Sequence, residues 1–269
     1  LAVRSIPDKK DKSEEINLLD ARLLATPSVA VNRSRTVAVT MANTSVETFK
    51  QSMTILKAYD KDLAEKIREG ESRVDDLEDM LGSYLVKLSG RNLSEDNSQE
   101  SYKLLHLLND FERISDHAVN LLESAEEIHE KQLIFSDEAK KEISVMMEAV
   151  NEILDLALRA FVDNDLQAAH SVEPLEEVID FLKSKLKTQH IKRLQRNECT
   201  IELGFVLTDI VTNLERVADH CSNIAGLVIE VSQNSFDMHN FLKTIKRDPG
   251  SEFARLFETY MEKYTIDAD

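Results

Sequence analysis

The feature that most constrains the fold is a stretch of twelve residues that occurs twice. Asn109–Asn120 reads NDFERISDHAVN, and Thr212–Asn223, 103 positions later, reads TNLERVADHCSN. Glu, Arg, Asp, His and the final Asn keep the same places in both copies. Five polar residues in register at one offset indicate an internal duplication, and therefore a fold made of two similar halves.

Apolar residues around each copy recur at alternating steps of four and three. They are Leu107, Phe111, Ile114, Ala118, Leu121, Ala125 and Ile128 in the first copy, and Ile210, Leu214, Val217, Cys221, Ile224, Val228 and Val231 in the second. This period predicts a long α-helix that packs along a coiled-coil-like seam. At about 100° per residue, Glu112, Asp116 and Asn120 fall in one line beside that seam.

The composition indicates helices throughout the chain. The 269 residues include only 6 Gly and 4 Pro and no Trp, and Leu, Ile, Ala, Glu, Asp and Lys predominate. Such usage is typical of an all-α protein. No apolar run approaches the ~20 residues of a membrane-spanning helix, and no signal peptide is visible. Because the chain begins at Leu1 without Met, we expect it to be a piece of a longer protein.

The formal net charge of −17 excludes one class of partner. A nucleic-acid binder needs a basic stripe that replaces phosphate counterions, so we expect no nucleic acid. An acidic balance suits cations or a basic protein surface instead. Cys199 and Cys221 are far apart and form no Cys-x-x-Cys motif. We therefore expect them to be reduced, buried thiols of a cytosolic protein.

Helix-start signals divide the chain into two similar halves. Thr26-Pro27, Asp60 and Ser136 are predicted to begin three of the helices, and the fifth helix is expected to be interrupted or kinked at Pro174. The predicted plan is a linker at 1–25, a three-helix bundle at 26–132, a second three-helix bundle at 133–236 and a helical tail at 237–269. The fold class predicted is therefore all-α, with a tandem pair of three-helix bundles and a short C-terminal helical tail.

Short loops place acidic residues of neighbouring helices at the same height. Because the loop near Asn92 is short, the second and third helices of the first bundle must run antiparallel. Counting outward from that loop, and from the matching loop near Asn197, brings acids of one helix opposite acids of the next. The predicted metal ligands are Glu71, Asp75, Glu112 and Asp116 in the first bundle and Glu176, Asp180, Glu215 and Asp219 in the second. Four like charges this close need cations or protons.

A site made only of carboxylates favours hard or borderline ions, namely Fe, Mn, Mg or Ca, with Zn less favoured. The alternative is that all these acids lie on a solvated helix face, where such pairs are routine. Convergence from two helices and recurrence in the duplicate favour the metal site. His117 and His220 point about 100° away from the preceding Asp. We expect them to pack or to support the ligands.

At these residues the sequence resembles the PhoU family. Glu112 with Asp116, and Glu215 with Asp219, match the Glu/Asp-x-x-x-Asp motif of that family. The motif occurs in each of two three-helix repeats and binds multinuclear metal clusters. More narrowly, Leu19–Pro27 and the aromatic tail resemble the region after the membrane part of bacterial sodium/phosphate cotransporters that end in a PhoU-like domain.

The resemblance implies a regulatory role in phosphate uptake without catalytic turnover. It implies bound metal, with Fe favoured, and it leaves open whether phosphate binds through that metal. The implied partner is a membrane transporter in the same polypeptide or complex, at the cytoplasmic face of the bacterial plasma membrane, and we expect a homo-oligomer. One departure concerns Asp110, which is Asn213 in the second copy. It leaves open a difference in charge and occupancy between the two sites.

Two other functions fit parts of the sequence. A ferritin-like di-metal carboxylate oxidase builds its site from bundle carboxylates but needs Glu-x-x-His on two helices. Glu126 and His129 have that spacing, whereas the equivalent positions are Ile229 and Ser232. A metal-free helical adaptor is the other alternative. Convergence of the four acids in each bundle would favour the metal-binding function over the metal-free adaptor.

Overall fold

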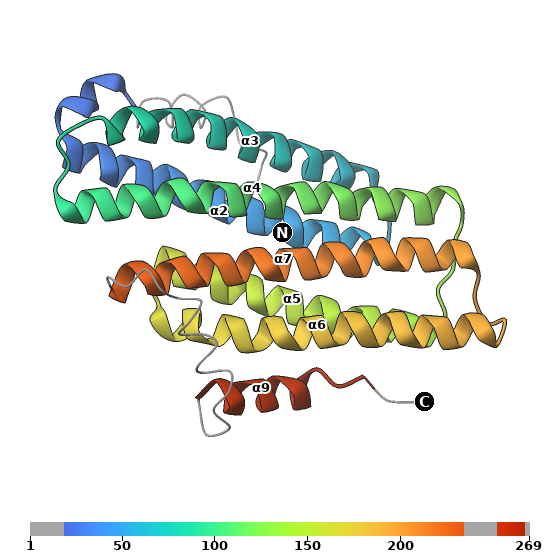
Figure 1. Cartoon of the computed structure of the whole chain (residues 1–269). Helices are drawn as coiled ribbons and strands as arrows, with labels where there is room; N and C mark the ends of the chain where they lie inside the picture. Colours follow the sequence, from blue (N-terminus) through green and yellow to red (C-terminus); the bar gives the residue numbers. More distant parts are fainter. Residues whose placement is uncertain (1–18, 234–251, 267–269) are drawn as a thin grey trace, which may run out of the picture.

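The structure is a computed structural model that describes residues 19–233 and 252–266, and these form helices and loops (Figure 1). Its elements are the 3-10 helix η1 (Ala21–Ala25) and the α-helices α2 (Pro27–Ile55), α3 (Lys61–Ser89), α4 (Glu95–Glu130), α5 (Asp137–Val162), α6 (Leu166–Gln195), α7 (Ile201–Gln233) and α9 (Glu252–Lys263). Among the described residues there is no strand. A search of the same residues finds no helix with the length and hydropathy of a membrane span.

Side-chain caps set where most of the helices begin. Asp60 and Ser136 each accept a hydrogen bond from the backbone of the third helical residue, at 2.8 Å and 3.2 Å, as predicted. Thr26 is the N-cap residue of α2, as predicted, but its side chain makes no capping hydrogen bond. Pro27 at the first helical position has a preset φ and no N–H, which favours a helix start without help from Thr26.

The helices form two bundles of three, which confirms the predicted fold class. α2, α3 and α4 pack together, α5, α6 and α7 pack together, and α4 packs against α7 between the bundles. α4 and α7 run side by side in opposite directions through the middle of the molecule (Figure 1). The apolar repeat faces inward, because Phe111, Ile114, Val217 and Cys221 are 2 % exposed or less. The duplicated stretches therefore lie where the two halves of the molecule meet.

α6 runs through Pro174 from Leu166 to Gln195 as one helix. A proline in a helix interior removes a hydrogen bond and costs about 3 kcal/mol. The ring of Pro174 and the neighbouring Val172 and Leu175 are buried, so this turn is anchored in the core. Tertiary packing offsets the local cost, and the interruption considered from the sequence is not found.

Segments at the two ends of the described chain each cover one bundle. η1 contacts α2 and α3, with Leu19 and Leu24 buried. α9 contacts α6, and Tyr260 and Tyr264 are buried there. Of the predicted linker and tail, residues 1–18, 237–251 and 267–269 lie outside the described residues. The core that positions the acidic side chains is thus made by α2 to α7.

Candidate metal centre

The acids predicted in the first bundle converge across α3 and α4. We call Glu71, Asp75, Glu112 and Asp116 the first acidic site. Ligand oxygens of Glu71, Asp75 and Asp116 lie within 4.8 Å of one another. Glu71 and Asp75 lie one turn apart on α3, and Asp116 faces them from α4. The approach of carboxylates across the helix pair is therefore present, while metal binding by them stays a prediction.

Burial and mutual repulsion raise the pKa of three carboxyls in the first acidic site. Burial, followed by the charge of Asp116, raises the pKa of Glu112 to about 7. Burial also raises the pKa of Glu71 and of Asp75, and the Asp116 carboxylate adds to both shifts. Arg113 offsets part of this charge, with Nη1 2.8 Å from Asp116 Oδ2 and Nε 3.4 Å from Glu112 Oε2. The Arg113 side chain is 51 % exposed and so is free to turn toward solvent.

The donor set of the first acidic site fits a hard cation. Mg²⁺, Ca²⁺ and Mn²⁺ prefer carboxylate oxygens, which three converging side chains supply here. His117 points elsewhere, since its Nδ1 lies 2.8 Å from Oδ1 of Asn213. Within the described chain, the residues that would hold such an ion are Glu71, Asp75 and Asp116, with Glu112 beside them.

The second bundle arranges its acids differently. The predicted ligands there form the second acidic site: Glu176, Asp180, Glu215 and Asp219. Burial and then the charge of Glu215 raise the pKa of both Asp180 and Asp219, so these three carboxyls are neighbours across α6 and α7. Glu176 instead meets Glu173 and Glu177 within 4.8 Å along α6. Among the described residues, the convergent trio of this bundle therefore lies on one helix. The meeting of all four acids in the second bundle stays a prediction.

A lysine lies within the second acidic site. α3 and α6 correspond when they are aligned by their N-caps, and one offset of 105 positions relates Asp165 to Asp60, Glu176 to Glu71, Asp180 to Asp75 and Lys183 to Glu78. Lys183 thus takes the place of a carboxylate in the first bundle. Its Nζ lies 2.6 Å from Glu215 Oε1, and the two side chains are 22 % and 13 % exposed. Our sequence reasoning missed Lys183, although alignment of the predicted ligands Glu71 and Asp75 with Glu176 and Asp180 would have revealed it.

The two histidines lie at the contact between the bundles. His220 Nδ1 is 2.9 Å from Asp110 Oδ1, and His117 Nδ1 is 2.8 Å from Asn213 Oδ1. The two rings lie 5.7 Å apart between centroids. The contacts are reciprocal because α4 and α7 are antiparallel copies of each other. These contacts agree with the packing expected for the two rings, while support of metal ligands by them stays a prediction.

The residues of the di-metal oxidase alternative are engaged in other contacts. Arg68 Nη2 lies 2.7 Å from Glu126 Oε2. The ring of His129 stacks on Tyr59 with 4.5 Å between centroids. Neither residue belongs to a convergent group of metal-binding side chains in the described chain. The geometry gives this alternative no support.

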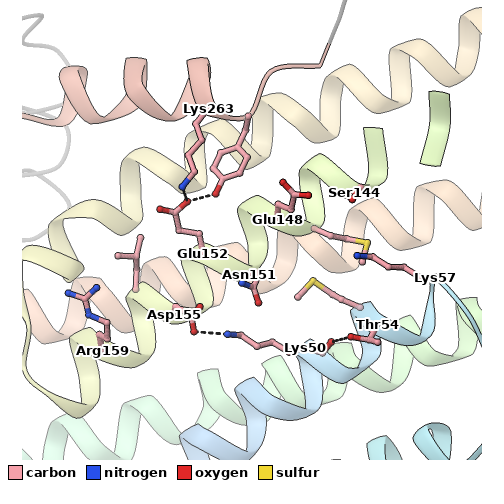
Figure 2. Close-up of a pocket in the computed structure, with 14 residues that line it drawn as sticks. Lys50, Thr54, Lys57, Ser144, Glu148, Asn151, Glu152, Asp155, Arg159 and Lys263 are labelled. Atoms are coloured by element: carbon pink, nitrogen blue, oxygen red, sulfur yellow. Dashed lines mark hydrogen bonds and ion pairs between the residues drawn. The ribbon is translucent and has the colours of Figure 1, made fainter. Parts of the chain in front are cut away.

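A groove of about 540 Å³ lies between α2, α5 and the end of α9 (Figure 2). Lys50 and Asp155 form an ion pair of 2.6 Å across it. Lys263 pairs with Glu152 at 2.7 Å, and the hydroxyl of Tyr264 also donates to that carboxylate. These opposite charges pair with each other, and so they hold α5 to α2 and to α9. The groove is therefore a weaker ligand candidate than the first acidic site.

Known proteins resemble this chain in sequence and in fold. The family model of the PhoU domain matches residues 38–125 and 143–228. Phosphate-specific transport system accessory protein PhoU homolog 1 of Thermotoga maritima is 27 % identical over 209 residues, which are 77 % of this chain and 88 % of that protein. A PhoU homolog of Borreliella burgdorferi is 28 % identical over 189 residues, 66 % of this chain and 81 % of that protein.

Two solved structures share the fold. The crystal structure of PhoU from Pseudomonas aeruginosa superposes with a TM-score of 0.71 at 21 % identity, over 76 % of this chain and 97 % of that one. The phosphate transport system regulatory protein PhoU from Streptococcus pneumoniae gives a TM-score of 0.69 at 19 % identity, over 78 % and 98 %. Identities this low support the tandem-bundle fold alone.

Proposed function

The chain belongs to the PhoU domain family, and from that premise we propose that it regulates phosphate transport and binds metal ions at its first acidic site. The relatives in sequence are named accessory proteins of a phosphate-specific transport system. An accessory protein of that kind acts on a transporter and carries out no catalytic turnover. The family match covers both halves, so the regulatory role is assigned to the pair of bundles as a unit.

The observation that carries the metal proposal is the convergence of Glu71, Asp75 and Asp116 within 4.8 Å from two helices. Oxygen donors of this kind favour Fe, Mn, Mg or Ca over Zn. By resemblance to the family we propose Fe, in a cluster of more than one ion. A bound ion supplies positive charge and open coordination positions that phosphate oxygens can fill. The protein contributes the acidic cradle, and Arg113 beside it lends a further positive charge.

The proposed partner is a membrane transporter, in the same polypeptide or in a complex, at the cytoplasmic face of the bacterial plasma membrane. Membership of a sodium/phosphate cotransporter rests on the likeness of Leu19–Pro27 and of the aromatic tail to such proteins. The relatives found are named accessory proteins, so they support a transporter partner more broadly than a cotransporter. A homo-oligomer is part of the same proposal.

The test of the proposal is thermal unfolding with and without metal. At a free metal concentration of about 100 times Kd, an ion that binds only the folded state adds about 2.7 kcal/mol, or roughly 5–10 °C in Tm for a chain of this size. Asp116→Asn should abolish most of this increment with Fe²⁺ or Mn²⁺. Without metal the variant should be as stable as wild type or more so, because it removes one repelling charge.

Asp96→Asn is the matched control, since Asp96 is an exposed residue in the first turn of the same helix. It should keep the full metal increment. In cells, Asp116→Asn in the parent protein should change the regulation of phosphate uptake, while Asp96→Asn should not. If no metal shifts the Tm of wild type, the metal site is refuted and the adaptor function replaces it.

A further inference from the structure

The two acidic sites differ in the sign of one charge, and we infer that Lys183 supplies the cation of the second acidic site in place of a metal ion. Metal then binds at the first acidic site alone. This inference deepens the proposed function and rests on its metal binding. It concerns a residue that has no counterpart of the same charge in the first bundle, where Glu78 stands at the equivalent place.

The position of the Lys183 ammonium is the first argument. Nζ lies 2.6 Å from Glu215 Oε1, within a pair of largely buried side chains. The same charge acts on the carboxyls of Asp180 and Asp219. A metal ion bound by these acids would have to share the space with a fixed ammonium group. A metal ion and an ammonium group bound to the same carboxylate would repel each other strongly in a partly buried site.

The contrast with the first acidic site is the second argument. Each site also has one arginine next to its acids, Arg113 with Asp116 and Arg216 with Asp219, and both arginines are more than half exposed. An exposed guanidinium can turn into solvent when an ion binds. Lys183 is mostly buried and extends from α6 into the carboxyl group of its partner. It is therefore the cation that the second site cannot easily release.

The oxygens of Glu215 are the third argument. Glu215 Oε2 is buried and has no hydrogen-bond partner in the described chain. Oε1 of the same carboxylate pairs with the ammonium of Lys183, so a metal ion bound by Glu215 would meet that positive charge. Glu176, which the repeat would place near Glu215, lies within 4.8 Å of Glu173 and Glu177 on its own helix. The second site therefore fits a built-in ammonium better than a metal cluster.

Binding of Mn²⁺ to the intact protein tests which site takes metal, counted by equilibrium dialysis with elemental analysis. Asp219→Asn should leave the amount of bound Mn²⁺ unchanged, whereas Asp116→Asn should remove most of it. Glu78→Lys places an ammonium in the first site, and it should weaken Mn²⁺ binding by at least about tenfold. Loss of Mn²⁺ from Asp219→Asn equal to that from Asp116→Asn would overturn the inference.

A second arm needs no metal binding by wild type. Lys183→Met keeps the length of the apolar stem and removes the charge, so in EDTA its Tm should fall below that of wild type. Lys187→Met, one turn further along α6, is the matched control and should change Tm little. If the two variants melt alike in EDTA, Lys183 is not the internal cation.

The two arms separate this inference from the proposed function. Absence of Mn²⁺ binding in wild type, together with a lower Tm of Lys183→Met in EDTA, would refute the metal function and keep the role of Lys183. Mn²⁺ binding that depends on Asp116 and Asp219 alike would keep the metal function and refute the role of Lys183.

Discussion

Single carboxyl groups in this protein have their charge set by the neighbouring helix. Glu112 lies beside Asp116 on α4, and the negative charge of Asp75 on α3 also acts on its carboxyl. Burial and these neighbours raise its pKa from 4.5 to about 7, against the opposing charge of Arg113. A residue that looks like an ordinary helical glutamate thus becomes one that exchanges a proton near neutral pH. Binding of a cation at the same place would release that proton.

The raised pKa of Glu112 predicts a pH dependence of stability in the metal-free protein. The folded state binds this proton more tightly than the unfolded state, so the carboxyl lowers the free energy of unfolding as pH rises from about 4.5 through 7. Glu112→Gln removes this loss. We expect the variant to gain on the order of 1 kcal/mol relative to wild type between pH 5 and pH 8, after allowance for solvent screening.

Urea unfolding in EDTA at the two pH values measures the effect. Glu123→Gln, an exposed change on the same helix, is the control and should shift stability equally at both pH values. An equal gain for Glu112→Gln at pH 5 and pH 8 would contradict the raised pKa.

Pairs of helices are joined by charges as well as by apolar side chains. α5 and α6 share a buried ion pair, in which Arg193 Nη1 and Nη2 donate to Glu142 Oε1 and Oε2 at 2.8 Å each. Both side chains are only 10 % exposed. Two parallel hydrogen bonds fix the relative position of the helices more narrowly than apolar packing does. Such a pair fixes how α5 and α6 are placed along each other. Its net contribution to stability depends on the cost of desolvating both charges.

Removal of one partner of this pair is predicted to cost more than removal of both. Arg193→Met leaves the carboxylate of Glu142 buried without its partner, which typically costs 3–5 kcal/mol. The double variant Glu142→Leu with Arg193→Met should recover about half of that loss or more. A double-mutant cycle from urea unfolding at pH 7 gives the coupling. Costs of the two single variants that simply add in the double variant would show that the pair is not coupled.

The whole molecule is built as two copies of one bundle that meet at α4 and α7. Antiparallel packing of these copies makes the contacts reciprocal, with His117 against Asn213 and His220 against Asp110. Each bundle is also covered by one terminal segment, because η1 packs on the first bundle and α9 packs on the second. Each cover buries a few large apolar or aromatic side chains, among them Leu24 and Tyr260. The two covers are therefore expected to act on separate halves.

This arrangement predicts that loss of one cover loosens one bundle. Tyr260→Ala removes a buried aromatic ring of α9, which typically costs about 3 kcal/mol of packing at a core position and less at the end of a chain. Amide hydrogen exchange should become faster in α9 and in the part of α6 that it covers, with α3 unchanged. Leu24→Ala should instead make amide hydrogen exchange faster in η1 and in its neighbours α2 and α3, with α6 unchanged. Equal acceleration in both bundles for either variant would show that the halves open as one unit.

The sequence by itself determined most of the helices, the duplication and the side of each long helix that carries acids. These depend on local signals, because Asp60 and Ser136 cap their helices and the four-three apolar repeat selects the buried face. The repeat also indicated the tandem bundles, since two copies of a one-sided helix must each bury that side. The expected approach of Glu71 and Asp75 to Asp116 followed from one short loop.

Only the tertiary structure decided what each acid faces. Spacing along the chain did not show that a lysine lies among the acids of the second bundle. In the structure the ammonium of Lys183 pairs with Glu215, and Glu176 lies close to Glu173 and Glu177. Packing also kept α6 continuous through Pro174, which local propensity would have broken. Spacing along one chain defines which residues share a helix face, but contacts between helices depend on how the chain packs in three dimensions.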